Sequence, residues 1–103
     1  MALIYLNEEN FENEVLNFKG KVLIDFFATW CGPCKMLSPV IEELADELDD
    51  IKVCKLDIDK ATKIALQYNV MSVPTLLLFE DGVVVNTLIG FRPKEEILNE
   101  LGR

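Results

Sequence analysis

The 103-residue chain contains no histidine, few basic residues and no long apolar run. Without histidine or a second pair of closely spaced cysteines, one chain offers few of the side chains that hold zinc. Eighteen acidic against ten basic residues give a net charge of −8, which argues against nucleic acid or an anionic membrane as a partner. No stretch is long enough to span a bilayer, and no basic segment followed by an apolar one resembles a signal peptide. We therefore expect a cytoplasmic protein that binds no metal, no nucleic acid and no membrane.

The distribution of apolar residues predicts alternating strands and helices. Half of the residues are hydrophobic, 27% are charged, and no linker or repeat interrupts the chain, so we expect one domain over residues 1–103. Continuous apolar runs indicate strands buried on both faces, and Asn7 and Asp59 are candidate helix caps. The predicted strands are 2–6, 21–28, 51–58, 74–80 and 83–89, and the predicted helices are 8–17, 32–48, 60–67 and 93–101. This order predicts an α/β fold, with a mixed central sheet and helices on both faces.

Two cysteines stand two residues apart in Trp-Cys-Gly-Pro-Cys-Lys, residues 30–35, directly before a helical pattern. This spacing allows a dithiol/disulfide pair, half of a metal site or a structural bridge. A cysteine at a helix N-terminus faces unpaired backbone N–H groups and the positive end of the helix dipole, which favour the reactive thiolate. Pro33 suits the first turn of a helix, and Gly32 permits a tight turn there. We therefore expect Cys31 to be exposed at the helix N-terminus and Cys34 to lie one turn further in and more buried.

This hexapeptide, together with the apolar strand and the aspartate before it, resembles the active site of the thioredoxin family. The preceding segment, residues 22–28, is Val-Leu-Ile-Asp-Phe-Phe-Ala, and the likeness runs from about residue 4 to residue 101. Further matching positions are Pro39, Lys55, Val73-Pro74-Thr75, Gly82 and Gly90. The resemblance implies the thioredoxin fold, which is a mixed five-stranded central sheet flanked by four helices. The active-site turn then leaves the C-terminal end of a central strand, where open α/β sheets place their sites.

The resemblance also implies an activity, the reduction of disulfides in target proteins by an electron carrier of cell redox homeostasis. Cys31 is then the nucleophile that forms a mixed disulfide with the target, and Cys34 is the resolving thiol that releases it. Gly32 and Pro33 tune the redox behaviour of the pair, because oxidising members usually carry a histidine there. Such a protein-disulfide reductase binds no cofactor and is recharged by a thioredoxin reductase linked to NADPH or ferredoxin. Its expected partners are this reductase and disulfide-containing proteins, and we expect the chain to be a monomer.

Asp25 lies six residues before Cys31 in an otherwise apolar strand. A buried carboxylate without a partner is costly and tends to have a raised pKa. The resemblance implies that Asp25 is a proton acceptor for Cys34, acting through water, whereas the alternative is a structural ion pair. Lys55 matches the family's partner of this aspartate, and we expect it to contribute only electrostatically. Both interpretations can hold together.

Several residues match the surface with which the family docks its targets. They are Trp30, Gly32, Pro33, Val73, Pro74, Gly90 and Phe91. In the family the bond before the matching proline is cis and packs beside the cysteines, although the sequence itself does not fix the isomer. The backbone of Val73 is a candidate to pair with an extended target peptide, and Gly90 could leave room for it. For Trp30 and Phe91, ordinary packing is the alternative.

Other functions stay open at this point. The chain could be a binding module or complex subunit with this fold, in which redox activity is incidental. A zinc ion or cluster could also bridge the cysteine pairs of two chains. Cys54 has no partner within the motif and lies in a predicted buried strand, so we expect it to be an inert buried thiol.

Overall fold

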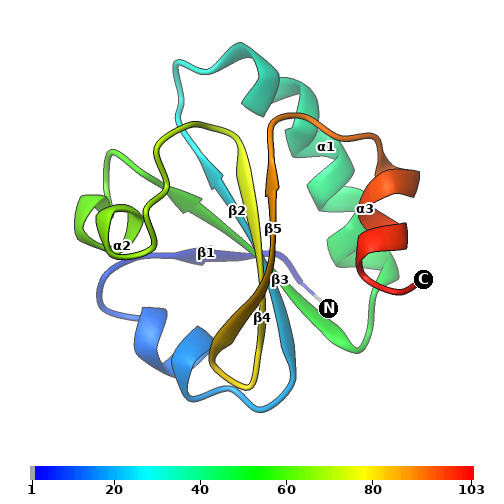
Figure 1. The fold of residues 1–103 in the computed structure, drawn as a ribbon, viewed down its shortest axis with the longest axis horizontal. Coiled ribbons are helices and arrows are strands. Elements are labelled where there is room, and N and C mark those ends of the chain that lie inside the picture. The colour runs from blue at the N-terminus through cyan, green and yellow to red at the C-terminus, as the bar shows by residue number, and fades with distance from the viewer. Residues whose placement is uncertain (1) are drawn as a thin grey trace.

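Five strands form one sheet in the order β1-β3-β2-β4-β5 in the computed structural model, which describes residues 2–103 (Figure 1). The strands are β1 (Ile4–Leu6), β2 (Lys21–Phe27), β3 (Ile51–Asp57), β4 (Thr75–Glu80) and β5 (Val83–Ile89). Strand β3 is parallel to β1 and β2, whereas β4 is antiparallel to β2 and to β5. The predicted mixed sheet is thus confirmed.

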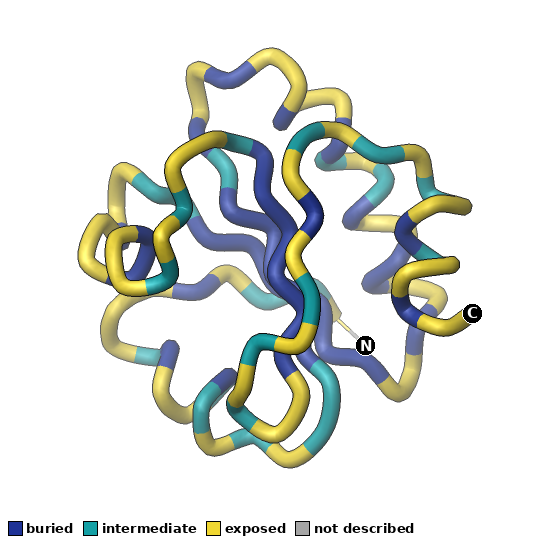
Figure 2. Tube along the Cα trace, in the orientation of Figure 1, coloured by how far each residue is buried: buried dark blue, intermediate teal, exposed yellow. Residues whose placement is uncertain are grey.

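Helices cover both faces of this sheet (Figure 1). The helices are η1 (Glu12–Leu16), α1 (Gly32–Glu47), α2 (Thr62–Gln67) and α3 (Lys94–Glu100). Even-numbered residues of β2, such as Ile24 and Phe26, pack against η1 and α2 in one core cluster. Odd-numbered residues such as Leu23 pack against α1 and α3 in another. The central strands are buried on both sides, and exposed residues lie on the outer surfaces of the helices (Figure 2). This three-layer arrangement confirms the predicted fold.

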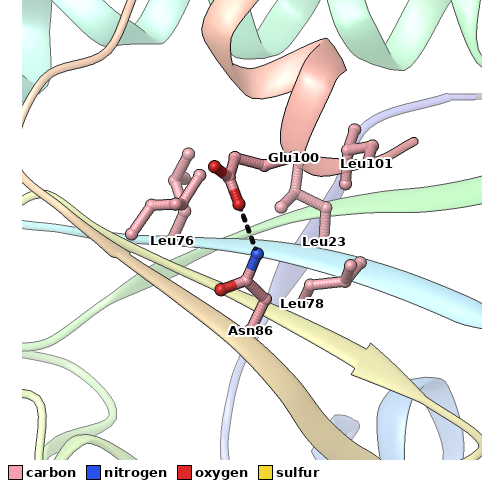
Figure 3. A pocket seen from close by; sticks show the side chains of 7 residues that line it. Leu23, Leu76, Leu78, Asn86, Glu100 and Leu101 are labelled. Carbon is pink, nitrogen blue, oxygen red and sulfur yellow. Dashed lines mark hydrogen bonds between the residues drawn. The ribbon is translucent and has the colours of Figure 1, made fainter. Parts of the chain in front are cut away.

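The α3 end of the second cluster holds a small pocket between the helix and the sheet (Figure 3). Its walls are mostly leucines from β2, β4 and β5, together with Leu101, which directly follows α3. At its rim the Asn86 amide donates a 2.8 Å hydrogen bond to Glu100 Oε2, which ties β5 to α3 above the leucines. The pocket therefore belongs to the core packing that holds the last helix on the sheet.

The first helix differs from the predicted α-helix over 8–17. Residues 8–10 form turns, and residues 12–16 form a π-helix, in which the Asn17 N–H bonds the Glu12 carbonyl five residues back at 2.8 Å. The N-cap of η1 is Phe11, which makes no side-chain capping bond, so the prediction that Asn7 caps this helix is wrong. The Asn7 side chain instead accepts a 2.7 Å hydrogen bond from the backbone N–H of Asn10 in the preceding turn. The wider helical turn still buries Val15, which packs in the first core cluster.

The third predicted helix begins two residues later than expected. Helix α2 starts at Thr62, and its N-cap is Ala61, which makes no side-chain capping bond. The prediction that Asp59 caps this helix is therefore wrong, because its carboxylate is bound elsewhere, as described below. The remaining predicted elements agree with the structure to within two residues at each end.

Candidate active site

The two motif cysteines lie at the junction of β2 and α1, at the upper end of the sheet in Figure 1. Cys31 is the N-cap of α1, with φ −92° and ψ 117°, and its sulfur accepts a 3.1 Å hydrogen bond from the backbone N–H of Cys34. The two residues form a disulfide, and their Cα atoms are 5.3 Å apart. Cys31 Sγ therefore occupies the position where a helix offers its unpaired N–H groups to a negative charge.

The predicted exposure of Cys31 is wrong in this disulfide state. Cys31 is 5% exposed and Cys34 3%, so both are buried. The capping contact draws the Cys31 sulfur toward the helix, and residues from other segments cover the disulfide. Phe27, Ile58 and Val73 pack against the pair. In this state little of the Cys31 side chain is open to a partner.

The residues between the cysteines occupy the first turn of α1. Pro33 lies where its missing N–H leaves no helical bond unmade, as predicted. Gly32 has an ordinary helical backbone, and a Cβ there would meet no atom within 4 Å. We expected Gly32 to permit a tight turn, but the backbone at this position is one that other residues also adopt. Both residues are exposed on the outer side of the disulfide.

The Val73-Pro74 step lies directly against the disulfide. The peptide bond between these residues is cis, as the resemblance implies. The carbonyl oxygen of Val73 is 3.6 Å from Cys31 Sγ, and the Pro74 carbonyl accepts a 2.9 Å hydrogen bond from the Gly90 N–H. Gly90 has φ +91°, which only glycine adopts without strain, and the space beside it is open. The fold thus brings Cys31, Val73, Pro74 and Gly90 together along one edge of the candidate active site.

Two aromatic side chains lie on the surface beside this edge. Trp30 is 67% exposed and Phe91 is 40% exposed, so ordinary core packing explains neither. The indole N–H of Trp30 donates a 2.9 Å hydrogen bond to Asp59 Oδ2, which fixes one end of the ring. Asp59 is a site residue that sequence reasoning assigned to a helix cap instead, since no local pattern indicates its pairing with Trp30.

Asp25 lies beneath this surface, on the α1 side of β2. It is fully buried, and no described residue donates a hydrogen bond to either of its carboxylate oxygens. Burial raises the pKa of Asp25 to about 7, and the positive charge of Lys55 opposes this rise only in part. A carboxyl group with such a pKa can accept and return a proton near neutral pH.

Lys55 is the register partner of Asp25 on β3, and its side chain is buried too. Its ammonium group donates a 2.6 Å hydrogen bond to Ser38 Oγ on α1 and lies 4.5 Å from the centre of the Phe27 ring. The predicted electrostatic influence of Lys55 on Asp25 is present, without a hydrogen bond between them. Ser38 is a second residue that sequence reasoning missed.

A hollow of about 240 Å³ opens beside Cys34 and reaches Lys55. Its lining residues are Phe27, Ala28, Thr29, Cys34, Lys35, Ser38 and Lys55. Its volume is enough for several water molecules, and hydroxyl and ammonium groups in its wall can bind them. Cys34 therefore borders a hollow that can hold water.

Residues 2–103 contain neither a cluster of side chains suited to a metal ion nor a helix suited to a membrane. Within residues 2–103, no three Cys, Asp or Glu side chains gather closely enough to hold a metal ion. None of the helices in that range has the length and apolar character needed to cross a membrane. Cys54 is fully buried on the opposite face of the sheet, and burial raises its pKa to about 12, in agreement with the predicted inert thiol.

Comparison with known proteins places these features in a family. The model of the family described as Thioredoxin matches residues 2–103. A Bacillus subtilis protein named Thioredoxin is 48% identical over 98 residues, which are 94% of this chain and 92% of that protein. Proteins of the same name from Chlamydia trachomatis and Staphylococcus haemolyticus are 46% and 43% identical, and the matches cover 95% and 100% of this chain and 94% and 98% of theirs.

Proposed function

The chain belongs to the thioredoxin family and is a protein-disulfide oxidoreductase, and from that premise we propose how its residues divide the work. Cys31 is the nucleophile, and Cys34 is the resolving thiol. The observation that carries this assignment is the capping geometry, because the Cys34 N–H donates to Cys31 Sγ at the start of α1. Hydrogen bonds to a sulfur stabilise its thiolate, so the Cys31 side of the pair is the one that ionises first.

The reaction runs as two thiol–disulfide exchanges. The Cys31 thiolate attacks one sulfur of a target disulfide, a new S–S bond forms, and the second target sulfur leaves as a thiolate. Cys34 then loses its proton and attacks Cys31 Sγ, which releases the first target sulfur as a thiolate. The target gains two electrons, and the cysteine pair becomes the disulfide that the structure describes.

Asp25 takes the proton of Cys34 in the second exchange. Its burial and its pKa of about 7 support this role, because a group that titrates near neutral pH exchanges protons in both directions. The hollow beside Cys34, which Lys55 also lines, supplies space for water next to the resolving thiol. Lys55, on β3, acts only through its positive charge and neither donates nor accepts a proton in the reaction.

The edge formed by Val73, Pro74 and Gly90 receives the target. The Val73 backbone can pair with an extended peptide while its carbonyl lies beside Cys31 Sγ. Open space at Gly90 leaves room for a second backbone, and Trp30 and Phe91 offer exposed apolar area on either side. A modest apolar surface of this kind suits many partners that one covalent bond holds for a short time.

The recharging system and the location follow from this chemistry. The carrier needs a thioredoxin reductase, linked to NADPH or ferredoxin, to return the disulfide to the dithiol. We propose that it acts in the cytoplasm, where thiols are kept reduced, as a monomer without a bound cofactor. The competing function, a binding module with incidental redox activity, predicts that the cysteines are dispensable.

The reduction of insulin disulfides with dithiothreitol as the reductant tests the proposed function. We expect the protein to accelerate insulin precipitation well beyond dithiothreitol alone and the Cys31→Ser variant to give no acceleration. Cys54→Ser is the matched control, and it should keep the wild-type rate because Cys54 lies on the other face of the sheet. Equal rates for the wild type and Cys31→Ser would refute the carrier function and leave the binding module.

A further inference from the structure

We propose that Ser38 is a positioning residue, whose hydroxyl group holds the Lys55 ammonium group on the α1 side of the hollow and so keeps Asp25 free of an ion pair. The proposal rests on the proposed role of Asp25 as proton acceptor. It assigns a task to a helix residue that carries no reacting atom. Ser38 lies one helical turn after Cys34, within the wall of the same hollow.

The contacts of Lys55 show where its charge is held. Its ammonium group donates to Ser38 Oγ at 2.6 Å, which is a short and well-formed hydrogen bond. Asp25 and Lys55 are register partners on adjacent parallel strands, so their side chains leave the sheet on the same face. Even so, neither oxygen of Asp25 accepts a hydrogen bond from any residue within 2–103. Ser38 therefore holds the ammonium group toward α1, in a position where it makes no hydrogen bond to the neighbouring carboxylate.

The other groups around Asp25 do not replace this contact. From β4 its register partner is Leu76, which is apolar. From α1, Lys35 lines the outer part of the hollow, and Glu42 Oε2 lies 3.5 Å from Ser38 Oγ, too far for a strong hydrogen bond. Lys55 is thus the cation whose placement decides how strongly the Asp25 carboxylate is stabilised.

The placement matters because Asp25 has two possible states. A carboxylate in direct contact with an ammonium group stays ionised and is a weak base. Without that contact, burial keeps the pKa of Asp25 at about 7, where it can take a proton from a thiol. By binding Lys55, Ser38 keeps the Asp25 carboxyl group out of direct contact with the ammonium group.

The test is a titration of Asp25 in the oxidised protein, in which the paired cysteines do not titrate. The carboxyl ¹³C shift of Asp25 is followed against pH in the wild type and in Ser38→Ala. We expect the midpoint to fall by about one pH unit in Ser38→Ala, because the released ammonium group moves toward the carboxylate. Ser38→Thr keeps a hydroxyl group and should restore most of the wild-type midpoint. Alanine is a good helix former at this half-buried site, so the fold is expected to survive.

A second comparison isolates Lys55 as the carrier of the effect. In a Lys55→Met background, Ser38→Ala should leave the Asp25 midpoint unchanged, because no ammonium group remains to be moved. An unchanged or raised midpoint in Ser38→Ala alone would overturn the proposal, and so would an equal fall in the Lys55→Met background. These titrations need no turnover, so their failure is distinct from a failure of Asp25 as proton acceptor, which the insulin activity of Asp25→Asn measures.

Discussion

Replacing Asp25 by asparagine should make the stability of the oxidised protein depend less on pH. Asp25 is fully buried, and burial raises its pKa from the ordinary 3.8 to about 7 in the folded chain. An acid whose pKa is raised by folding favours the folded state while it is protonated. Its contribution is therefore lost as the pH rises from about 4 through about 7, because the unfolded chain releases the proton first.

The size of this loss follows from the two pKa values. A tenfold change in a protonation equilibrium corresponds to about 1.4 kcal/mol at 25 °C. The difference between 3.8 and about 7 therefore corresponds to about 4 kcal/mol of unfolding free energy. Asparagine has nearly the same shape and does not titrate. The variant should thus gain about 4 kcal/mol over the wild type between pH 4 and pH 8, whatever the constant cost of its buried amide.

Urea unfolding of both oxidised proteins at several pH values from 4 to 8 measures this difference. Asp46→Asn is the control, because it makes the same chemical change at an exposed position of α1. The difference between Asp25→Asn and the wild type should rise steadily across this range, while that of the control stays nearly constant. A difference for Asp25→Asn that does not change with pH would refute the reasoning, since it would mean that the buried carboxyl group titrates as it does in the unfolded chain.

Two further predictions concern residues away from the disulfide. Gly82 has φ +84°, and a Cβ there would lie 2.5 Å from the Leu16 carbonyl oxygen, whereas Gly102 has φ +81° with open space. Gly82→Ala should therefore lower the unfolding free energy by about 2 kcal/mol or more and Gly102→Ala by about 1 kcal/mol, as measured in urea, and equal effects would rule out the clash. Cys54 is fully buried with a pKa of about 12, so iodoacetamide should label the oxidised protein at neutral pH only after unfolding, as seen by mass spectrometry. Rapid labelling of the folded protein would show that β3 opens readily.

The strands of the sheet could be predicted from the sequence because a strand that is buried on both faces consists almost entirely of apolar residues. Strands β2, β3 and β4 are covered on both faces, so they appear as continuous apolar runs with recognisable ends. The turn between β4 and β5 fits its residue types, since Asp81 and Gly82 both adopt the positive φ values that a two-residue turn requires. Asp25 could be recognised as a candidate site residue because it is a charged residue inside a buried, otherwise apolar strand.

The features that sequence reasoning missed depend on contacts between distant segments. Asp59 has the right residue type to cap a helix, but the indole of Trp30, 29 residues away, takes its carboxylate. Ser38 could be assigned to Lys55 only once α1 and β3 were placed together, 17 residues apart in sequence. The burial of Cys31 likewise depends on Val73 and Ile58, which only the fold brings to the disulfide. Local patterns determined the elements, and tertiary contacts decided the partners of individual side chains.

The most direct test of the account compares which of the two sulfurs forms the bond to a target. Reduced Cys34→Ser and Cys31→Ser are each mixed with a disulfide-containing protein such as insulin, and adducts are located by mass spectrometry of peptides. The account predicts a stable adduct on Cys31 in the first variant, released by dithiothreitol, and almost none on Cys34 in the second. Equal adducts on both cysteines, or an adduct on Cys34 alone, would contradict the assignment of Cys31 as the nucleophile.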